Sequence, residues 1–231
     1  MPITLITGGN KGLGREAARR LLALGHTVYI GARDPGRGRS AADELGAHFL
    51  SLDVTDDASV DAAAAALTAR EGHLDVLINN AGIAGLGLTI EGTSADDMRH
   101  IFETNVFGLV RVTRGFLPLL RAAPSGVIVN VSSGLGSFGL VTDPARIESR
   151  FPALAYGASK AAVSMLTLQY AKALPDLRIN AVDPGPTSTD LNNHRGRQTV
   201  AEGTDAIVRL ATIGPDGPTG TFSDRHGPLP W

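Results

Sequence analysis

Tyr156 and Lys160 stand four residues apart in the stretch Tyr156-Gly157-Ala158-Ser159-Lys160. On a helix this spacing places both side chains on one face, one turn apart. A free tyrosine, with a pKa of about 10, works poorly as an acid or base near neutrality, but a neighbouring positive charge lowers that pKa. The pair is therefore a candidate proton-transfer device. A packed ring beside a solvated amine is the alternative explanation of the same spacing.

The composition is that of one globular domain. The chain has 231 residues, of which 43% are hydrophobic and 19% charged, enough to bury a sizeable core. A net charge of −2 does not indicate a nucleic-acid surface or a polybasic membrane patch. The absence of Cys excludes disulfides and thiolate chemistry and fits a reducing compartment. Without a signal-peptide pattern or a long apolar run, a cytoplasmic protein with no membrane or nucleic-acid partner is expected.

Apolar, β-branched runs alternate with helical patterns along the chain. Ile3–Thr7 is a predicted strand, followed by a glycine-rich turn, a helical pattern and a second strand over 27–30. This βαβ order implies a parallel sheet. Further strands are predicted over 48–52, 74–78, 127–131, 178–182 and, at a sheet edge, 220–222, and helices over 58–70, 94–120, 152–174 and 199–212. Residues 1–231 are thus predicted to form a single-domain, doubly wound α/β (Rossmann-type) sheet of about seven strands with helices on both faces.

Polar or glycine-rich clusters follow almost every predicted strand. Because ligands bind at the carboxyl ends of parallel strands, these clusters are expected to converge on one crevice. The first cluster contains Gly8, Gly12 and Gly14 between a strand and a helix, a place where backbone can approach a pyrophosphate at the helix N-terminus. Its G-x-x-x-G-x-G spacing departs from the G-x-G-x-x-G pattern, and a glycine-rich surface turn is the alternative.

Taken together, the motifs resemble those of the short-chain dehydrogenase/reductase family over almost the whole chain. They occur in the family's order: Thr-Gly-Gly-Asn-Lys-Gly-Leu-Gly at 7–14, Asn-Asn-Ala-Gly at 79–82, Asn105, Ser133, Tyr156-x-x-x-Lys160 and Pro184-Gly185. The Thr-Gly-Gly-Asn-Lys-Gly start, the wide interval between Ser133 and Tyr156 and the final Gly-Pro-Leu-Pro-Trp are similar to the carbonyl-reductase branch.

The resemblance implies a catalytic role for four residues. Tyr156 would be the general acid that protonates a carbonyl oxygen during reduction, and Ser133 would hydrogen-bond that oxygen. Lys160 would bind the nicotinamide ribose hydroxyls and lower the pKa of Tyr156. Asn105 would anchor a water that links Lys160 to solvent.

The cofactor expected from the resemblance is NADP(H) rather than NAD(H). A carboxylate at the end of the second strand binds the ribose 2′-hydroxyl of NAD, whereas a basic residue accommodates the 2′-phosphate of NADP. A count of about 20 residues from the glycine turn reaches Asp34, which would argue for NAD. The family's acidic position, however, matches Ala32, and Arg33 matches the basic residue of NADP users. Lys11, just before Gly12, would add a second cation near the same 2′-phosphate.

The other implied cofactor contacts lie in the glycine turn, after later strands and in the loop after residue 183. Asp53 and Val54 would flank the adenine, and Thr187 and Thr189 would contact the carboxamide and phosphates. A purely structural role for 80–82 stays open. The full implied set is Gly8, Asn10, Lys11, Gly12, Leu13, Gly14, Arg33, Asp53, Val54, Asn80, Ala81, Gly82, Tyr156, Lys160, Pro184, Gly185, Thr187 and Thr189.

Residues 134–155 form an insertion that is wider than in most members of the family. We expect it to border the active site as one wall of a pocket for an apolar carbonyl or alcohol substrate; a surface excursion is the alternative. Such insertions can cover the face through which family members dimerise, so monomer and homodimer are both open. The six histidines show no metal-ligand spacing, and no metal site is expected.

The sequence therefore predicts an NADPH-dependent reductase of a ketone or aldehyde that runs reversibly as an alcohol dehydrogenase. Two alternatives are an NADP(H)-binding regulator without turnover and an epimerase or dehydratase on the same scaffold. The presence of all four implied catalytic residues favours an enzyme, because regulators of this kind typically lose one.

Overall fold

A single eight-stranded sheet forms the centre of the molecule. The computed structural model describes residues 1–85 and 87–231. The strand order is β3-β2-β1-β4-β5-β6-β7-β8, and every neighbouring pair is parallel except β7 and β8. The strands are β1 (Ile3–Thr7), β2 (Thr27–Ala32), β3 (His48–Ser51), β4 (Val76–Asn79), β5 (Val127–Val131), β6 (Arg178–Val182), β7 (Phe222–Asp224) and β8 (Gly227–Pro228). The doubly wound architecture is confirmed, with one short antiparallel strand beyond the expected seven.

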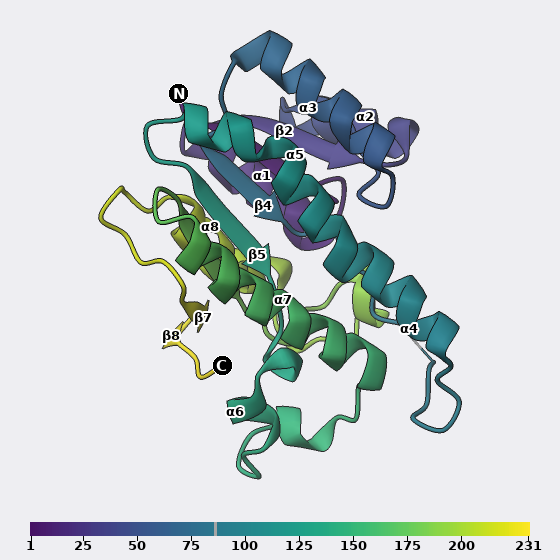
Figure 1. Cartoon of the computed structure of the whole chain (residues 1–231). Coiled ribbons are helices and arrows are strands. Elements are labelled where there is room, and N and C mark those ends of the chain that lie inside the picture. Colours follow the sequence, from purple (N-terminus) through teal and green to yellow (C-terminus); the bar gives the residue numbers. More distant parts are fainter. Residues whose placement is uncertain (86) are drawn as a thin grey trace.

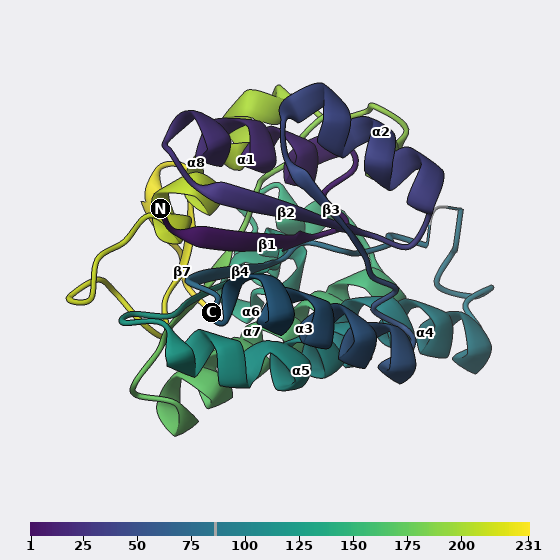
Figure 2. The same ribbon diagram turned by 90° about the horizontal axis from the view of Figure 1, so that it is seen from above.

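Helices cover both faces of the sheet (Figures 1 and 2). One layer contains α1 (Gly12–Ala23), α2 (Pro35–Leu45) and α8 (Val200–Ala211). The other contains α3 (Asp57–Glu71), α5 (Gly108–Ala122) and α7 (Leu154–Ala173), with α4 (Ala95–Phe102) leading into α5 and the short α6 (Phe138–Val141) before α7.

The side chains of the central strands pack into two hydrophobic clusters, one on each face of the sheet. In β1, Leu5 packs into the cluster below α3, α5 and α7, and its neighbour Ile6 packs into the cluster below α1, α2 and α8. Successive side chains of a strand point to opposite faces, and both faces of a parallel sheet are covered. This explains why β1, β4 and β5 are buried throughout and read as continuous apolar, β-branched runs.

The helix expected over 94–120 has an irregular centre. It starts with a capping box, in which the Ser94 side chain accepts a hydrogen bond from the backbone N–H of Asp97 and the Asp97 side chain accepts one from that of Ser94. After α4, a π-helical turn over Glu103–Phe107 precedes α5. Such a turn adds a residue to the helix and often marks a functional site. Asn105 lies within it.

Two further elements differ from expectation. The sequence did not predict α2, which Asp34 caps by accepting a hydrogen bond of 3.0 Å from the backbone N–H of Arg37. A helix cap is thus the observed role of Asp34, the residue whose position would have argued for NAD. The strand expected at the sheet edge over 220–222 is found two residues later as β7, over 222–224. It is not the edge strand, because β8 lies outside it in the sheet.

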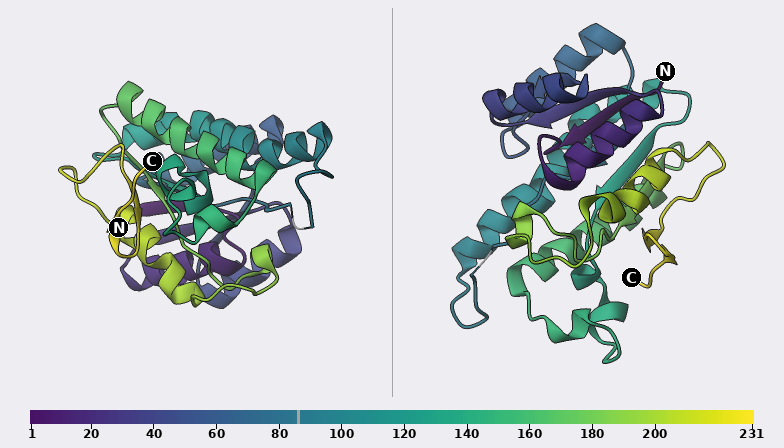
Figure 3. Two further views of the ribbon diagram at one scale, coloured as in Figure 1. Left: turned by 90° about the horizontal axis from the view of Figure 1, so that it is seen from below. Right: turned by 180° about the vertical axis from the view of Figure 1, so that it is seen from behind.

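The last residues of the chain return to the insertion. The Ser137 hydroxyl donates a hydrogen bond of 2.7 Å to the carbonyl oxygen of Pro230, and the Gly139 N–H donates one of 2.9 Å to that of Trp231. The Trp231 ring stacks on Phe222 of β7 with 5.5 Å between centroids. The C-terminal segment therefore connects α6 to β7, and the left view of Figure 3 places the C-terminus beside the ribbon of the insertion. Over 1–85 and 87–231, no helix is both long and apolar enough to cross a membrane.

Candidate active site

Tyr156 and Lys160 lie on successive turns of α7, as their spacing predicts. The Lys160 side chain is buried, and its Nζ lies 5.6 Å from the centroid of the Tyr156 ring. Nζ donates a hydrogen bond of 2.7 Å to the carbonyl oxygen of Val131, the last residue of β5. The pair is thereby held at the carboxyl end of β5, where Ser132 and Ser133 follow.

The two serines after β5 have different surroundings. Ser133 caps the 3-10 turn Gly134–Gly136, where its hydroxyl accepts a hydrogen bond of 3.2 Å from the Leu135 N–H, and it is close enough to Tyr156 to lower the pKa of that phenol. Ser132 instead donates a hydrogen bond of 3.0 Å to the Lys160 carbonyl oxygen, inside the packing between β5 and α7. The turn packs closely on α7: a Cβ placed on Gly136 would lie 2.4 Å from the Lys160 carbonyl carbon.

Asn105 connects the π-helical turn to α7. Its Nδ2 donates hydrogen bonds of 2.9 Å to the Ile83 carbonyl oxygen and 3.0 Å to the Ser159 hydroxyl. Ser159 in turn donates one of 2.7 Å to the carbonyl oxygen of Tyr156. The sequence analysis quoted Ser159 within the motif without giving it a role. Its position three residues after Tyr156, on the same helix face, was the available signal.

A small cavity of about 10 Å³ lies between Asn105 and Lys160. This volume is that of about one water molecule. Asn79 lines the same cavity, and its Oδ1 is buried without a hydrogen-bond partner among residues 1–85 and 87–231. The space therefore offers polar partners to one small molecule beside the Lys160 side chain.

The electrostatics of the pair differ from the expectation that Lys160 lowers the pKa of Tyr156. Burial, and then the nearby Asp183 carboxylate, raise the pKa of Tyr156 to about 12, against a smaller lowering effect of Ser133. Burial lowers the pKa of Lys160 to about 8. In this structure the low-dielectric surroundings outweigh the attraction between the two groups, so the phenol is held in its protonated form.

The glycine turn after β1 has the open backbone that its composition predicts. Gly8 and Gly12 have φ angles of 62° and 53°, which favour glycine. Asn80 supports the turn, because its Nδ2 donates hydrogen bonds to the carbonyl oxygens of Thr7 and Gly8. A Cβ on Gly14 would lie 2.6 Å from that Nδ2. These contacts correspond to the structural role that the sequence left open for the 80–82 stretch.

Thr7 is a residue of this region that the sequence analysis quoted within the glycine motif without giving it a role. Its hydroxyl accepts hydrogen bonds of 3.0 Å from the backbone N–H groups of both Asn80 and Ala81. The next residue, Gly82, brings the chain close to the catalytic candidates: a Cβ there would lie 3.3 Å from Asn105 Oδ1 and 3.6 Å from Lys160 Nζ.

Of the two candidates after β3, Asp53 is half-buried and Val54 is buried. The Asp53 carboxylate accepts hydrogen bonds from the backbone N–H and the hydroxyl of Thr55. Val54 is buried and packs against α5, where a Cβ on Gly108 would lie 2.8 Å from it. Asp53 thus stabilises the turn after β3, and Val54 packs this turn against α5.

Cationic side chains gather where α1 and α2 begin. Lys11 pairs with Asp190 at 2.9 Å, and Arg33 is exposed and makes no ion pair within the described part of the chain. A hollow of about 500 Å³ is lined by the polar side chains of Asn10, Lys11, Arg15, Arg37, Ser40, Glu44 and Asp190. The sequence analysis missed Arg37, although the four-residue spacing from Arg33 could have indicated it.

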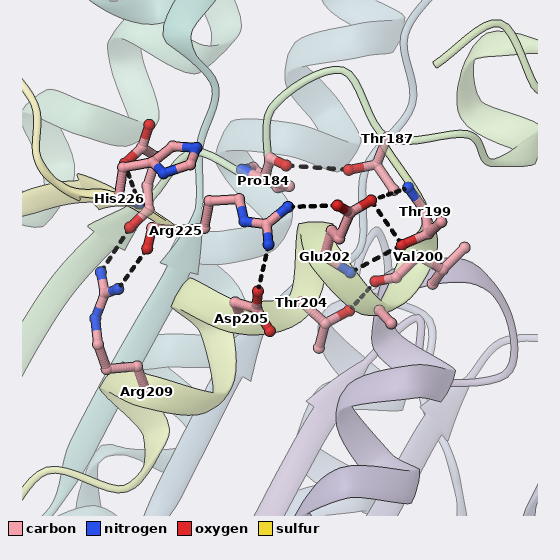
Figure 4. Close-up of polar contacts among 12 residues, drawn as sticks. Pro184, Thr187, Thr199, Val200, Glu202, Thr204, Asp205, Arg209, Arg225 and His226 are labelled. Carbon is pink, nitrogen blue, oxygen red and sulfur yellow. Dashed lines mark hydrogen bonds and ion pairs between the residues drawn. The ribbon is translucent and has the colours of Figure 1, made fainter. Parts of the chain in front are cut away.

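The loop after β6 packs against α8 (Figure 4). The Thr187 hydroxyl donates a hydrogen bond of 3.0 Å to the Pro184 carbonyl oxygen and lies against α8, where a Cβ on Gly203 would be 2.1 Å away. Glu202, which completes the capping box of α8, pairs with Arg225 at 2.8 Å.

The two threonines of this loop, Thr187 and Thr189, therefore differ in burial and in their neighbours. Thr187 is buried, whereas Thr189 lies beside the glycine turn, with its methyl group 3.6 Å from the Cβ position of Gly12. Gly185 has a φ angle of 67°, and Leu13 of α1 approaches the Cβ position of Gly203 at 3.0 Å. The ends of β1 and β6 are thus brought together. No group of three or more metal-ligating side chains occurs among the residues that the structure describes.

Comparisons with known proteins place this chain in a family. The short chain dehydrogenase family model matches residues 2–199. The chain is 30% identical to (+)-neomenthol dehydrogenase of Capsicum annuum over 96% of this chain and 95% of that protein. It is 32% identical to (-)-isopiperitenone reductase of Mentha piperita over 97% of this chain and 96% of that protein.

Solved structures agree with this placement. NADPH-bound carbonyl reductase from chicken fatty liver superposes with a TM-score of 0.86 and 30% identity, with complete coverage (100%) of both chains. Salutaridine reductase from Papaver somniferum gives a TM-score of 0.84 and 27% identity over 97% of this chain and 99% of that one. The fold, the order of the motifs and these matches together show that the chain belongs to the short-chain dehydrogenase family of oxidoreductases.

Proposed function

We propose that this protein is an NADPH-dependent reductase of a ketone or aldehyde that also runs in reverse as an alcohol dehydrogenase. The observation that carries the proposal is the Tyr156 hydroxyl, which lies beside Ser133 and is held protonated at the carboxyl edge of the sheet. A phenol in that state is prepared to donate a proton. Relatives named as reductases and dehydrogenases support the same chemistry.

Each side chain of the site has a distinct task in the proposed reaction. Ser133 donates a hydrogen bond to the carbonyl oxygen of the substrate and orients it, and Tyr156 transfers its proton to that oxygen as negative charge develops there. Lys160 holds the ribose hydroxyls, and Asn105 keeps α7 in place through Ser159. NADPH, when bound, supplies the hydride. In the oxidative direction Tyr156 must first lose its proton to accept one from the alcohol.

The glycine turn and the cations beside it fit a phosphorylated dinucleotide. The positive φ angles of Gly8 and Gly12 leave the backbone open at the N-terminus of α1, which favours a pyrophosphate. Arg33, together with Lys11 and Arg37, supplies the positive charge that a 2′-phosphate requires. The carbonyl reductase neighbour contains NADPH, whereas a neighbour described as 3-ketoacyl-(acyl-carrier-protein) reductase contains NADH. The preference for NADP(H) therefore rests on these cations.

Residues 134–155 form the proposed wall of the substrate pocket. Four of their large apolar side chains are exposed: Phe138, Ile147, Phe151 and Leu154 have 74%, 39%, 57% and 45% of their surface accessible. Such a group favours a substrate with an apolar body. The segment begins directly after Ser133, so its apolar side chains can contact a substrate whose carbonyl group is held by that serine.

A panel of ketones and aldehydes, with NADPH oxidation followed by absorbance, tests the proposal. We expect turnover of at least one apolar carbonyl compound and a loss of about 10²-fold or more in Tyr156→Phe, the range of general acid catalysis. NADPH binding by wild type without turnover of any substrate would instead favour a regulatory protein. Retained turnover in Tyr156→Phe would remove Tyr156 from its role.

A further inference from the structure

Asp183 is a buried acid at the end of β6 to which the proposed mechanism gives no task. Only 7% of its surface is exposed. A carboxyl group is rarely buried to this extent without charged or hydrogen-bonding partners. Its Oδ1 accepts a hydrogen bond of 2.9 Å from the backbone N–H of Gly185. Because β5 and β6 are paired in register from Val127 to Val131, Asp183 lies directly beside the serines that follow β5.

The second oxygen of Asp183 faces the active-site turn. A Cβ placed on Gly134 would lie 2.9 Å from Asp183 Oδ2 and 3.1 Å from Glu148 Oε1. The carboxyl groups of Asp183 and Glu148 thus approach the residue next to Ser133. Glu148 comes from the insertion, where Arg146 pairs with it at 3.3 Å.

The four titratable groups around Asp183 come from three elements. Tyr156 and Lys160 belong to α7, Glu148 to the 3-10 turn Glu148–Arg150 and Asp224 to β7, and each interacts with the charge of Asp183. Burial is the main cause that raises the pKa of Asp183, and Glu148 and Asp224 add to it, whereas hydrogen bonds from Gly185 and Gly134 lower it. In the alkaline range where a phenol ionises, a carboxyl group with two such donors carries its charge.

On the basis of the proposed function, we propose that Asp183 is a positioning residue that acts through Tyr156. Its carboxylate lies beside the turn that follows Ser133, and its charge favours the protonated phenol, because ionisation of Tyr156 would place two negative charges in one dry site. Lys160 offsets only one of them. Tyr156 thereby keeps the proton that reduction requires up to a higher pH, while the same effect makes the phenol a weaker acid.

The raised pKa of Tyr156 agrees with this arrangement. After burial, Asp183 is the cause that raises it further. Asp183 also opposes the lowering of the Lys160 pKa by burial, so the same carboxylate favours the charged form of the lysine. One group therefore stabilises both partners in the protonation state needed for reduction.

Tyrosine titration tests the proposal without any turnover. The chain has three tyrosines, so the ring ¹³Cζ resonances of Tyr29, Tyr156 and Tyr170 can be assigned with single Tyr→Phe variants. In Asp183→Asn, Tyr156 should ionise at a pH lower by about one unit or more, the effect of removing a nearby like charge. Tyr29 and Tyr170 should not move. Asp176→Asn, which changes an exposed acid paired with Arg121, should shift none of the three.

A second variant and an activity measurement complete the test. Asp183→Ser is also neutral and keeps an acceptor for the Gly185 N–H, so it replaces Asp183→Asn if that variant does not fold. Where alcohol oxidation is measurable, its rise with pH should move to lower pH by the same amount as the Tyr156 titration. An unchanged Tyr156 titration in the folded neutral variants would overturn the proposal. A Tyr156 shift in a protein without turnover would support it while refuting the proposed enzyme function.

Discussion

The side-chain amide of Asn105 donates a hydrogen bond to the hydroxyl of Ser159, on the helix that carries Tyr156. Two segments far apart in sequence are joined by this contact, the π-helical turn after α4 and the first turns of α7. Because Ser159 also donates to the carbonyl oxygen of Tyr156, a displacement of Asn105 is transmitted to the backbone of the proposed general acid.

Removal of the Ser159 hydroxyl should weaken this connection. Ser159 is fully buried, so Ser159→Ala deletes one hydrogen bond to Asn105 and one to Tyr156. We expect the free energy of unfolding in urea to fall by about 1–3 kcal/mol, the cost of leaving buried polar groups without partners. Ser149→Ala, which removes an exposed hydroxyl bound to the Arg146 carbonyl oxygen, should change it by less than about 0.5 kcal/mol. Equal free energies of unfolding in the two variants would show that the Asn105–Ser159 hydrogen bond does not stabilise the fold.

Gly136→Ala should force the turn after Ser133 away from α7. The added methyl group would lie 2.4 Å from the Lys160 carbonyl carbon and 2.5 Å from the Ala161 nitrogen, atoms of a helix backbone that cannot rotate aside. Overpacking of this kind typically costs about 1–3 kcal/mol. Gly214→Ala is the matched control, because a Cβ there would meet nothing within 4 Å. Thermal unfolding of both variants measures the difference, and an unaltered midpoint in Gly136→Ala would contradict the close approach.

Burial of Lys160 should make stability depend on pH. Its pKa falls from 10.5 in the unfolded chain to about 8 in the folded protein, so the unfolded state binds more protons between these values. Stability should therefore rise as pH increases from about 8. The opposite effect of Tyr156, whose pKa rises from 10.0 to about 12, begins only above pH 10. Urea unfolding at pH 8 and pH 10 should show this rise in wild type but not in Lys160→Met. An equal change in the free energy of unfolding between pH 8 and pH 10 in both proteins would refute this prediction.

Elements set by local patterns were predictable from the sequence. The bounds of β1, β5 and β6 match the predicted strands to the residue, because each ends in a β-branched residue that is followed directly by Gly, Ser or Asp. In contrast, Gly36 and Gly38 lower the helix propensity of α2, which depends on its cap at Asp34 and on packing against β3.

The electrostatics of the site could not be predicted in the same way. The i, i+4 spacing brought Tyr156 and Lys160 together correctly, but it contains no information on burial or on Asp183, which arrives from another strand. Likewise, the loop sequence does not reveal that Thr187 turns under α8 whereas Thr189 adjoins Gly12. Tertiary packing decides both features.

Loss of Arg33 should affect NADPH far more than NADH. Arg33 is exposed and makes no ion pair within the described ranges, so its guanidinium is available to a 2′-phosphate. A charge-assisted hydrogen bond is worth about 1.5–3 kcal/mol, and Arg33→Ala should raise the KM for NADPH by about tenfold or more while leaving that for NADH nearly unchanged. Arg121→Ala, on the distant end of α5, is the control. Equal increases for the two cofactors would remove Arg33 from the proposed discrimination.

The apolar side chains of residues 134–155 should determine substrate preference without affecting the cofactor. In the double variant Phe138→Ala, Phe151→Ala, the KM for a bulky apolar ketone should rise by about tenfold or more, since burying one Phe side chain is worth about 1.5–3 kcal/mol. NADPH affinity, measured by fluorescence titration, should stay constant because neither residue belongs to the proposed cofactor contacts. Phe107→Ala is the control, since Phe107 is an exposed ring of the π-helical turn with 47% accessibility. Weaker NADPH binding in the double variant, or an unchanged KM for every ketone tested, would show that these side chains form no part of the substrate pocket.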